Sequence, residues 1–152
     1  MDSSATSATP PAAALSQFRV VELGSTISAP FCGRLLADFG AEVIKVEDVK
    51  GDTLRVLGEN YRDKSLYAAS LFRNKATIAI DLRQAEGRDI VGRLAARSDV
   101  LIENFRPGLM EEWGLGYETL KAINRGLVMV RISGFGQGGP YAKRPGYGEP
   151  AP

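Results

Sequence analysis

Short runs of apolar residues alternate with longer stretches in which apolar side chains recur every three or four positions. The short runs predict five β-strands, at 19–23, 42–47, 77–82, 100–103 and 127–132. The longer stretches predict helices at 30–39, 84–97, 109–113 and 117–124, with a shorter helical candidate at 64–72. Residues 48–63 are polar and contain glycine, so we expect a loop there.

The order of these elements predicts the fold class. Strands that alternate with helices, and that are almost continuously apolar, are typical of a parallel sheet covered by helices. We therefore expect an α/β fold: a Rossmann-like, mainly parallel sheet with helices on both faces. Gly40 follows the first predicted helix and is expected to end it in a left-handed conformation.

Both ends of the chain differ in composition from its centre. Residues 1–17 are rich in Ala, Ser, Thr and Pro, which predicts a flexible tail, with order beginning near Phe18. Residues 134–152 are rich in Gly and Pro and predict an irregular loop. Because compact domains seldom finish on such a loop, we expect 18–152 to be part of a larger domain whose continuation is missing.

Composition argues against several classes of function. The 152 residues contain 19 Lys and Arg against 18 Asp and Glu, a net charge of +1, which does not indicate nucleic acid or a membrane surface as a partner. The sequence has no histidine, which excludes histidine-based catalysis and histidine zinc ligands within it. The longest charge-free apolar stretch, 23–33, is too short to cross a bilayer. The single cysteine, Cys32, favours a reducing compartment, and we expect the cytoplasm.

The turn 24–30 connects the first strand to the first helix and is one candidate binding segment. Unpaired N–H groups at a helix start, together with the positive end of the helix dipole, suit an anion such as phosphate. Pro30 fits a first helical turn, because its missing N–H costs little there. The alternative is that Ser28 only caps the helix.

A second candidate is the segment 103–108, which follows the fourth predicted strand. Ligands of open α/β sheets bind beyond the carboxyl ends of the strands. Asn104 offers two donors and an acceptor, Phe105 a flat stacking face, and Arg106 a planar cation that suits phosphate or carboxylate. The alternative is an ordinary strand-to-helix turn.

Two further segments carry weaker signals. Before the third strand, Asn74 and Lys75 follow another cation, and this cluster either holds phosphates or is a solvated turn. Residues 134–139 echo the G-x-G-x-x-G fingerprint, but the fingerprint needs a helix next and a Pro/Gly-rich stretch follows instead. We therefore expect no dinucleotide site there, and a flexible loop that covers substrate is the better interpretation.

The tempting single residues have plainer interpretations. Asp81 and Asp99 have no catalytic partner at a telling spacing, so we expect both to be turn or cap residues. Cys32 is expected to be a structural thiol, since no histidine is present to activate it.

Five segments together, in this order, resemble the family III CoA-transferases, the CaiB/BaiF family that includes formyl-CoA:oxalate CoA-transferase. The matching runs are RVVELGSTISAPFCGRLLADFGAEVIKVE (19–47), RNKATIAIDL (73–82), SDVLIENFRPG (98–108), LGYETLKAIN (115–124) and ISGFGQGGPYAKRPGYGE (132–149). The resemblance covers about residues 18–149, and the ENFRPG and SGFGQxGPYAxRPGY motifs at this spacing are highly specific.

The resemblance implies a two-domain subunit with a Rossmann-like large domain, an interlocked homodimer, and transfer of CoA from an acyl-CoA thioester to a free carboxylic acid. In the family an aspartate attacks the donor thioester and forms a mixed anhydride. That aspartate follows the GFG-type loop by a few tens of residues, whereas this chain stops at Pro152. The resemblance thus implies a nucleophile and a second domain outside this chain, which alone would have no turnover. No metal, nicotinamide or flavin is implied.

The resemblance also implies which residues contact CoA. By position in the motifs they are Ile27, Ser28, Ala29, Asn74, Lys75, Asn104, Phe105 and Arg106. Asp48 stands where some relatives carry a basic residue near the adenosine end of CoA, which departs from the family pattern. Tyr147 and Glu149 are expected where the chain passes toward the reacting centre.

Two other functions remain open at this stage. An α-methylacyl-CoA racemase has the same fold, but it uses a histidine after the glycine equivalent to Gly146. Tyr147 stands there instead, and a tyrosine ionises at about pH 10, which makes it a poor base at pH 7. The chain could also be a non-catalytic fragment that binds CoA weakly, or whose exposed apolar surfaces drive association.

Overall fold

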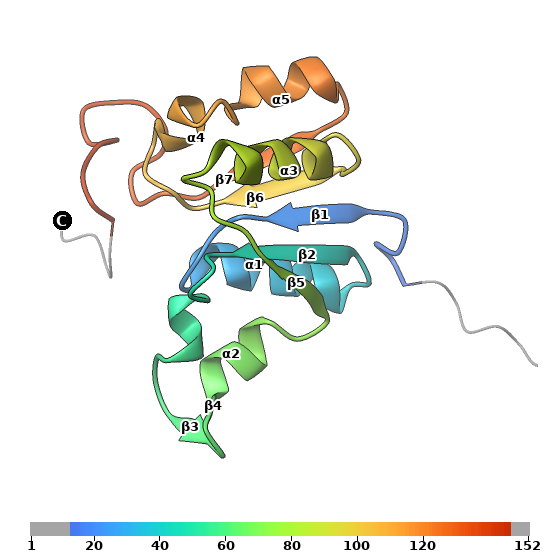
Figure 1. The fold of residues 1–152 in the computed structure, drawn as a ribbon, viewed down its shortest axis with the longest axis vertical. Helices are drawn as coiled ribbons and strands as arrows, with labels where there is room; N and C mark the ends of the chain where they lie inside the picture. Colours follow the sequence, from blue (N-terminus) through green and yellow to red (C-terminus); the bar gives the residue numbers. More distant parts are fainter. Residues whose placement is uncertain (1–12, 147–152) are drawn as a thin grey trace, which may run out of the picture.

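The computed structural model describes residues 13–146 and contains a five-stranded sheet in which every neighbouring pair of strands is parallel. The strands lie in the order β5-β2-β1-β6-β7 (Figure 1). Their bounds are β1 Arg19–Glu22, β2 Glu42–Glu47, β5 Lys75–Ala79, β6 Val100–Glu103 and β7 Val128–Arg131. This sheet confirms the predicted α/β fold class.

Helices cover both faces of the sheet, because successive side chains of a strand point to opposite sides. In β1, Val20 packs with residues of α1, whereas Val21 packs with residues of α3, α4 and α5. Figure 1 shows α3, α4 and α5 together on the face opposite α1. The bounds are α1 Ser28–Asp38, α3 Ala85–Ala95, α4 Leu109–Glu112 and α5 Tyr117–Ile123.

The end of α1 confirms the predicted role of Gly40. Its φ of 99° lies in the left-handed region, which favours glycine. The N–H of Gly40 donates to the carbonyl of Ala37, and that of Ala41 to the carbonyl of Leu36. These two hydrogen bonds form the Schellman pattern, which turns the chain directly into β2.

The segment between β2 and β5 holds structure that the sequence did not predict. Instead of one loop over 48–63, it contains the 3₁₀ helix η1 (Thr53–Arg55) and the strand β3 (Asn60–Tyr61). β3 pairs antiparallel with β4 (Lys64–Ser65), and this hairpin projects from the edge of the sheet (Figure 1). The turn residues Arg62 and Asp63 both have positive φ, without the glycine that normally signals such a hairpin.

Helix α2 (Leu66–Leu71) is shorter than the predicted 64–72. It begins after Ser65, whose hydroxyl accepts a hydrogen bond from the N–H of Ala68 and caps the helix. Because the cap residue belongs to β4, the helix starts only at the next residue.

Two other predicted boundaries were wrong by a few residues. The third strand was predicted over 77–82, but β5 ends at Ala79 because Asp81 already turns the chain by accepting the N–H of Arg83 at 3.0 Å. The first helix was predicted from Pro30, but α1 starts at Ser28, so the candidate residues there belong to the helix itself.

The last five residues of the predicted tail 1–17 lie within the described part of the chain. Residues 13–17 form a turn, because the apolar Leu15 packs on the α1 side of the core and its N–H donates to the carbonyl of Phe39 at 3.0 Å. The rest of that segment, together with Tyr147 and Glu149, lies outside the described residues. Over residues 13–146, no helix is long and apolar enough to cross a membrane.

Candidate functional site

The strand order places a crevice between β1 and β6. From β1 the chain continues to β2 and β5 on one side, and later to β6 and β7 on the other. Ligands of such sheets bind beyond the carboxyl ends of the strands where the order reverses. A cavity of about 340 Å³ lies there, lined by residues that follow four neighbouring strands, among them Ser25, Asp48, Asp81 and Phe105. We call it the switch-point cleft.

Asn104 joins the two strands that flank the crevice. Its Oδ1 accepts the N–H of Ser25 at 2.9 Å, and its Nδ2 donates to the carbonyl of Ser25 at 2.9 Å and to Oγ of Ser28 at 3.0 Å. Gly24 makes this approach possible, because an added Cβ would overlap Ala29 and lie 2.5 Å from Oδ1 of Asn104. The structure therefore brings together Ser28 and Asn104, which lie 76 positions apart.

This contact bears on the alternative that Ser28 only caps the first helix. Ser28 is not a helix cap, because Ile27 holds the cap position and no side chain caps the helix. The side chain of Ile27 is exposed, whereas that of Ala29 is fully buried, so Ala29 has only backbone groups to offer a ligand. The first N–H groups of a helix have no carbonyl one turn earlier to accept their hydrogen bonds. The first turn of α1 thus retains the anion-binding potential that the sequence indicated.

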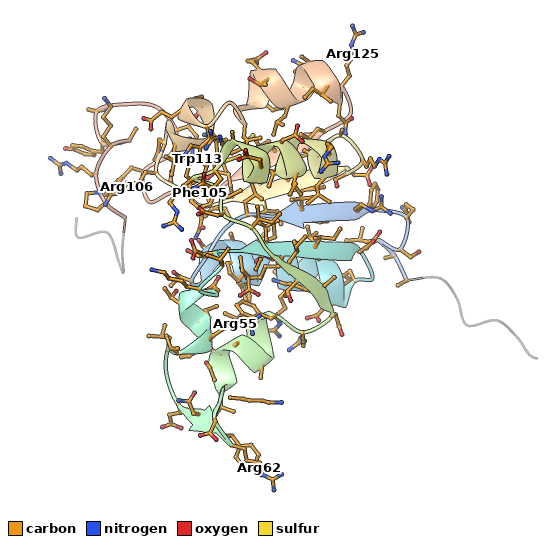
Figure 2. The ribbon with its side chains drawn as sticks, viewed as in Figure 1. Arg55, Arg62, Phe105, Arg106, Trp113 and Arg125 are labelled. Carbon is orange, nitrogen blue, oxygen red and sulfur yellow. The ribbon has the colours of Figure 1, made fainter. Side chains whose placement is uncertain are left out.

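Phe105 lines the cleft as an aromatic wall. Its ring meets Trp113 edge to face, with the centroids 5.3 Å apart, and both residues lie at the same end of the sheet (Figure 2). The buried carboxylate of Glu103 accepts the N–H of Phe105 at 2.7 Å and also pairs with Arg131 at 2.7 Å. Arg131 pairs in turn with Glu111, and this hydrogen-bonded pair lowers the pKa of the Glu111 carboxyl. The buried carboxylate of Glu103, itself fixed by Arg131, therefore anchors the loop after β6 to the sheet.

Arg106 is exposed beside this wall and points away from the fold (Figure 2). Its guanidinium forms no ion pair with the carboxylates of residues 13–146. Arg106 does not itself line the cleft, but it follows Phe105, which does, and it is a cation able to meet a phosphate or carboxylate.

The cleft is also lined by charged side chains and by an apolar floor formed by Leu23, Val46 and Ile80. Arg83 pairs with Asp81 at 2.7 Å and with Asp48 at 3.7 Å. The hydrogen bonds from Arg83 hold the pKa of Asp81 below its usual range, so this carboxylate is charged at neutral pH. Asp81 is thus a turn residue, as predicted, although it also lines the cleft. Asp99 accepts the N–H of Arg19, at the amino end of the sheet.

Asn74 and Lys75 lie elsewhere. Asn74 has a positive φ of 60°, and its amide donates to Asp38 at the end of α1. The ammonium of Lys75 is fully buried, bonded to Glu22 at 2.5 Å and to the carbonyl of Pro30 at 2.7 Å. Burial lowers the pKa of Lys75, although Glu22 partly opposes the shift. Neither residue lines the switch-point cleft. Of the eight residues predicted to contact CoA only Phe105 lines it, and a CoA contact by any of them stays a prediction.

Several residues that line the cleft were not predicted from the sequence. Trp113 is the only tryptophan in the sequence and follows the ENFRPG segment closely, which is a usable signal. Arg83, Asp52 and Thr53 also line it, Arg83 from the turn between β5 and α3 and the other two from the segment that follows β2. No periodicity could have placed those three.

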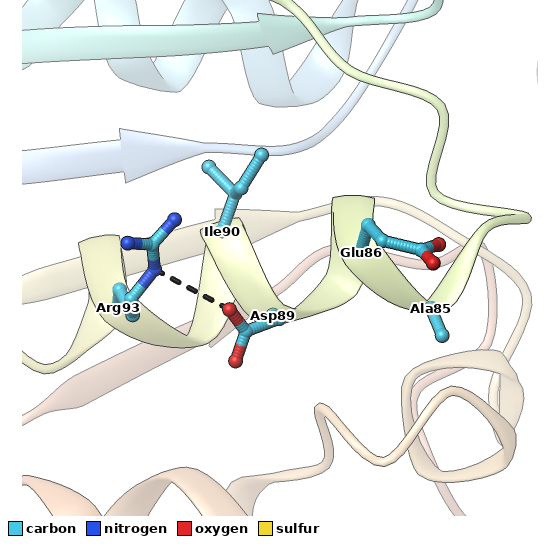
Figure 3. A pocket seen from close by; sticks show the side chains of 5 residues that line it. All are labelled: Ala85, Glu86, Asp89, Ile90 and Arg93. Atoms are coloured by element: carbon cyan, nitrogen blue, oxygen red, sulfur yellow. Dashed lines mark ion pairs between the residues drawn. The ribbon is translucent and has the colours of Figure 1, made fainter.

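A second hollow, of about 430 Å³, lies over α3 and carries no comparable chemistry. All five of its lining residues come from that one helix, and its only ion pair joins Asp89 and Arg93 at 3.4 Å (Figure 3). No other element supplies a group that converges on it. Among residues 13–146 there is also no cluster of three or more side chains suited to a metal ion.

Cys32 gives a first testable prediction. It lies half-buried in α1, where burial and then the negative charge of Glu22 raise the pKa of its thiol, with Lys75 partly opposing them. The thiolate fraction at pH 8 is therefore smaller than that of a free cysteine, whose pKa is about 8.5. We expect iodoacetamide to modify Cys32 at least several-fold more slowly than a cysteine peptide, measured by mass spectrometry across pH 7–10. A rate equal to that of the peptide would contradict this.

Comparison with known proteins agrees with the geometry. Residues 15–151 match the sequence profile of CoA-transferase family III. Succinyl-CoA–D-citramalate CoA-transferase of Chloroflexus aurantiacus is 55% identical over 136 residues, which are 88% of this chain and 34% of that protein. The α-methylacyl-CoA racemase of Mus musculus is 45% identical over 129 residues, which are 85% of this chain and 30% of that protein.

Comparison with solved structures points to the same family. The crystal structure of a CAIB/BAIF family protein from Brucella suis aligns with a TM-score of 0.84 and 43% identity, over 90% of this chain and 38% of that one. The chain therefore spans about a third of the length of the relatives it matches. With a profile match over nearly its whole length and a close structural match, this chain belongs to CoA-transferase family III.

Proposed function

We propose that the protein containing this chain transfers CoA from an acyl-CoA thioester to a free carboxylic acid, and that this chain supplies part of its CoA site. The observation that carries the proposal is the contact of Asn104 with Ser25 and Ser28, which ties the start of α1 to Ser25, a lining residue of the switch-point cleft. Membership of the family and the name of the Chloroflexus relative support the reaction class. The single cysteine favours a reducing setting such as the cytoplasm.

The chemistry of the cleft fits the parts of CoA. A flat purine suits the aromatic wall of Phe105 and the apolar floor, and the cleft volume lies at the small end of the ~300–1,000 Å³ typical of ligand pockets. The phosphates suit the exposed guanidinium of Arg106 and the first N–H groups of α1, at Ser28 and Ala29. Asp48 and Asp81 face the same cleft, and both are already paired with Arg83.

We propose the covalent route implied by the family resemblance. A carboxylate attacks the thioester carbonyl, the C–S bond breaks, and CoA leaves as a thiolate while an acyl anhydride forms on the enzyme. The thiolate then attacks that anhydride, which releases the donor acid and leaves CoA on the enzyme. The acceptor carboxylate attacks the enzyme–CoA thioester, which releases the thiolate and forms a second anhydride. The thiolate then attacks the acceptor carbonyl of that anhydride, which forms the new acyl-CoA and frees the enzyme carboxylate. The carboxylates that line the cleft are engaged with Arg83, Arg55 or Lys45, which supports a nucleophile outside this chain.

The outer face of α1 supports association between subunits. Ile27, Phe31, Leu35 and Phe39 recur every four residues, and each exposes about 40–60% of its surface. Apolar surface of this extent usually marks an interface. We propose that it is covered in the interlocked homodimer that the resemblance implies.

The racemase remains the second candidate, because the mouse racemase is 45% identical over most of this chain. A racemase moves the proton next to the thioester carbonyl and needs a suitable base. This sequence contains no histidine. Exchange of the C2 proton of a branched acyl-CoA for deuterium, catalysed by the complete protein, would favour the racemase over the transferase.

Calorimetry of the 152-residue chain with CoA tests the proposal, with light scattering on the same sample. We expect one CoA per chain, and at least tenfold weaker binding by Phe105→Ala, because the aromatic wall is lost. A monodisperse folded chain that gives no heat with CoA would contradict the proposal, as would an aggregate without saturable binding.

A CoA-exchange assay on the same chain tests where the nucleophile lies. We expect no exchange above a protein-free blank. Turnover by the chain alone would show that one of its own carboxylates is the nucleophile.

A further inference from the structure

Four charged side chains lie buried beneath the start of α1, and the function proposed above uses none of them for chemistry. The side chains of Glu22, Lys45 and Lys75 are fully buried, and that of Asp52 is 1% exposed. Lys45 lies 3.0 Å from Glu22 and 2.9 Å from Asp52, and Lys75 lies 2.5 Å from Glu22. The ring face of Phe72 covers the ammonium of Lys45 from another side. We call this set the buried charge network.

Stability alone does not explain this network. Two positive and two negative groups neutralise one another, but each must leave water to do so. Apolar residues of similar volume are often as stable as such pairs or more so. Besides the ion pairs, the network makes hydrogen bonds to the backbone, and these show what it holds in place.

Those bonds go to the turn that leads into α1. Nζ of Lys45 donates to the carbonyl of Gly24 at 2.8 Å. Oδ1 of Asp52 accepts the N–H of Thr26 at 3.2 Å and that of Leu54 at 2.9 Å. The hydroxyls of Thr26 and Thr53 lie 3.1 Å apart. The turn 24–26 is thus tied to the segment that follows β2.

The same turn is strained. Thr26 has a φ of 66°, in the left-handed region that β-branched residues avoid. Such a conformation persists only where the surroundings enforce it. Asn104 holds the turn at Ser25 from the β6 side, and the buried charge network holds it at Gly24 and Thr26 from the β2 side.

We propose that Lys45 and Asp52 are positioning residues that hold Thr26 left-handed and so aim the first N–H groups of α1 and the Ser25–Asn104 junction at the ligand. The inference rests on the function proposed above, since it needs a ligand at the switch-point cleft. Lys45 does not line the switch-point cleft, and Asp52 lines it with a side chain that is only 1% exposed. Both act through the backbone of the turn.

The double variant Lys45→Met with Asp52→Leu is the central test. It removes one charge of each sign, so the pair of Glu22 and Lys75 stays balanced. We expect it to bind CoA at least tenfold more weakly than the wild-type chain. Leu120→Ala is the matched control, because it destabilises the core at α5 without touching the turn. It should keep wild-type CoA affinity wherever it is folded.

A rescue separates positioning from general destabilisation. Thr26→Gly adopts a positive φ without strain. Added to the double variant, it should recover at least threefold of the lost affinity, whereas a merely structural role for the network predicts no recovery. Equal CoA binding by the double variant and wild type, or an equal loss in Leu120→Ala, would overturn the inference. If wild type itself does not bind CoA, the proposed function fails instead.

Hydrogen exchange of the wild-type chain, free of ligand, tests the same claim if the double variant does not fold. The Thr26 amide should exchange at least tenfold more slowly than an unstructured amide, because Asp52 accepts its proton. Exchange at the unstructured rate would show that the turn is not held, and would overturn the inference without any variant.

Discussion

Replacing Asn104 with leucine should weaken CoA binding by at least tenfold and lower the stability of the chain by about 2–4 kcal/mol. Leucine has nearly the same volume, but it removes the acceptor for the N–H of Ser25 and the donor to Ser25 and Ser28. The backbone groups of Ser25 then lose their partner at the mouth of the cleft. Calorimetry with CoA measures the first effect, and urea unfolding measures the second.

Asn124→Ala is the matched control for this prediction. The amide of Asn124 also donates to two carbonyls, those of Ala95 and Ser98 at 3.1 and 2.7 Å, but near the amino end of the sheet. This variant should lose a similar amount of stability, about 1–3 kcal/mol, and keep its CoA affinity. If Asn104→Leu bound CoA as tightly as Asn124→Ala, Asn104 would be an ordinary turn residue and the proposed site would be wrong.

Replacing Gly24 with alanine should destabilise the chain by about 1–3 kcal/mol or more and distort the cleft. The new methyl group would overlap the methyl group of Ala29 and press on Oδ1 of Asn104. Neither neighbour can move easily, because Ala29 is fully buried and Asn104 is held by three hydrogen bonds. Thermal unfolding measures the loss, and CoA titration shows whether the cleft is disturbed.

Gly92→Ala makes the same chemical change where there is room for it. Gly92 lies within α3, and an added methyl group there has no other atom within 4 Å. Alanine favours a helix over glycine by about 1 kcal/mol, so this variant should be more stable than wild type. A loss of stability in Gly92→Ala, or none in Gly24→Ala, would contradict the packing described here.

The local pattern of the sequence was enough to predict the sheet and its covering helices. Strands such as β1 and β6 are short apolar runs, and each must bury both faces, so helices on both faces follow. The pattern failed between β2 and β5. There the hairpin depends on positive φ at both Arg62 and Asp63, and arginine does not signal such a conformation.

The candidate site was predicted in part. The motifs pointed to Ser28 and Asn104, and the structure brings these two side chains into contact. They pointed equally to Lys75, whose ammonium the structure places inside the molecule, bonded to Glu22. From the sequence alone, a lysine beside a turn is expected to be exposed to solvent. Only the packing of α1 over β1 and β5 shows that it is enclosed.

By itself, then, the sequence determined which segments become strands and helices, because hydrophobic periodicity acts over a few neighbouring residues. It also determined the family, through motifs that are local as well. The tertiary structure decided which of these segments meet: the hold of Asn104 on a turn 79 positions away, the burial of Lys45, and the left-handed Thr26. Such features depend on contacts between distant parts of the chain, and their energies exist only once the sheet has formed.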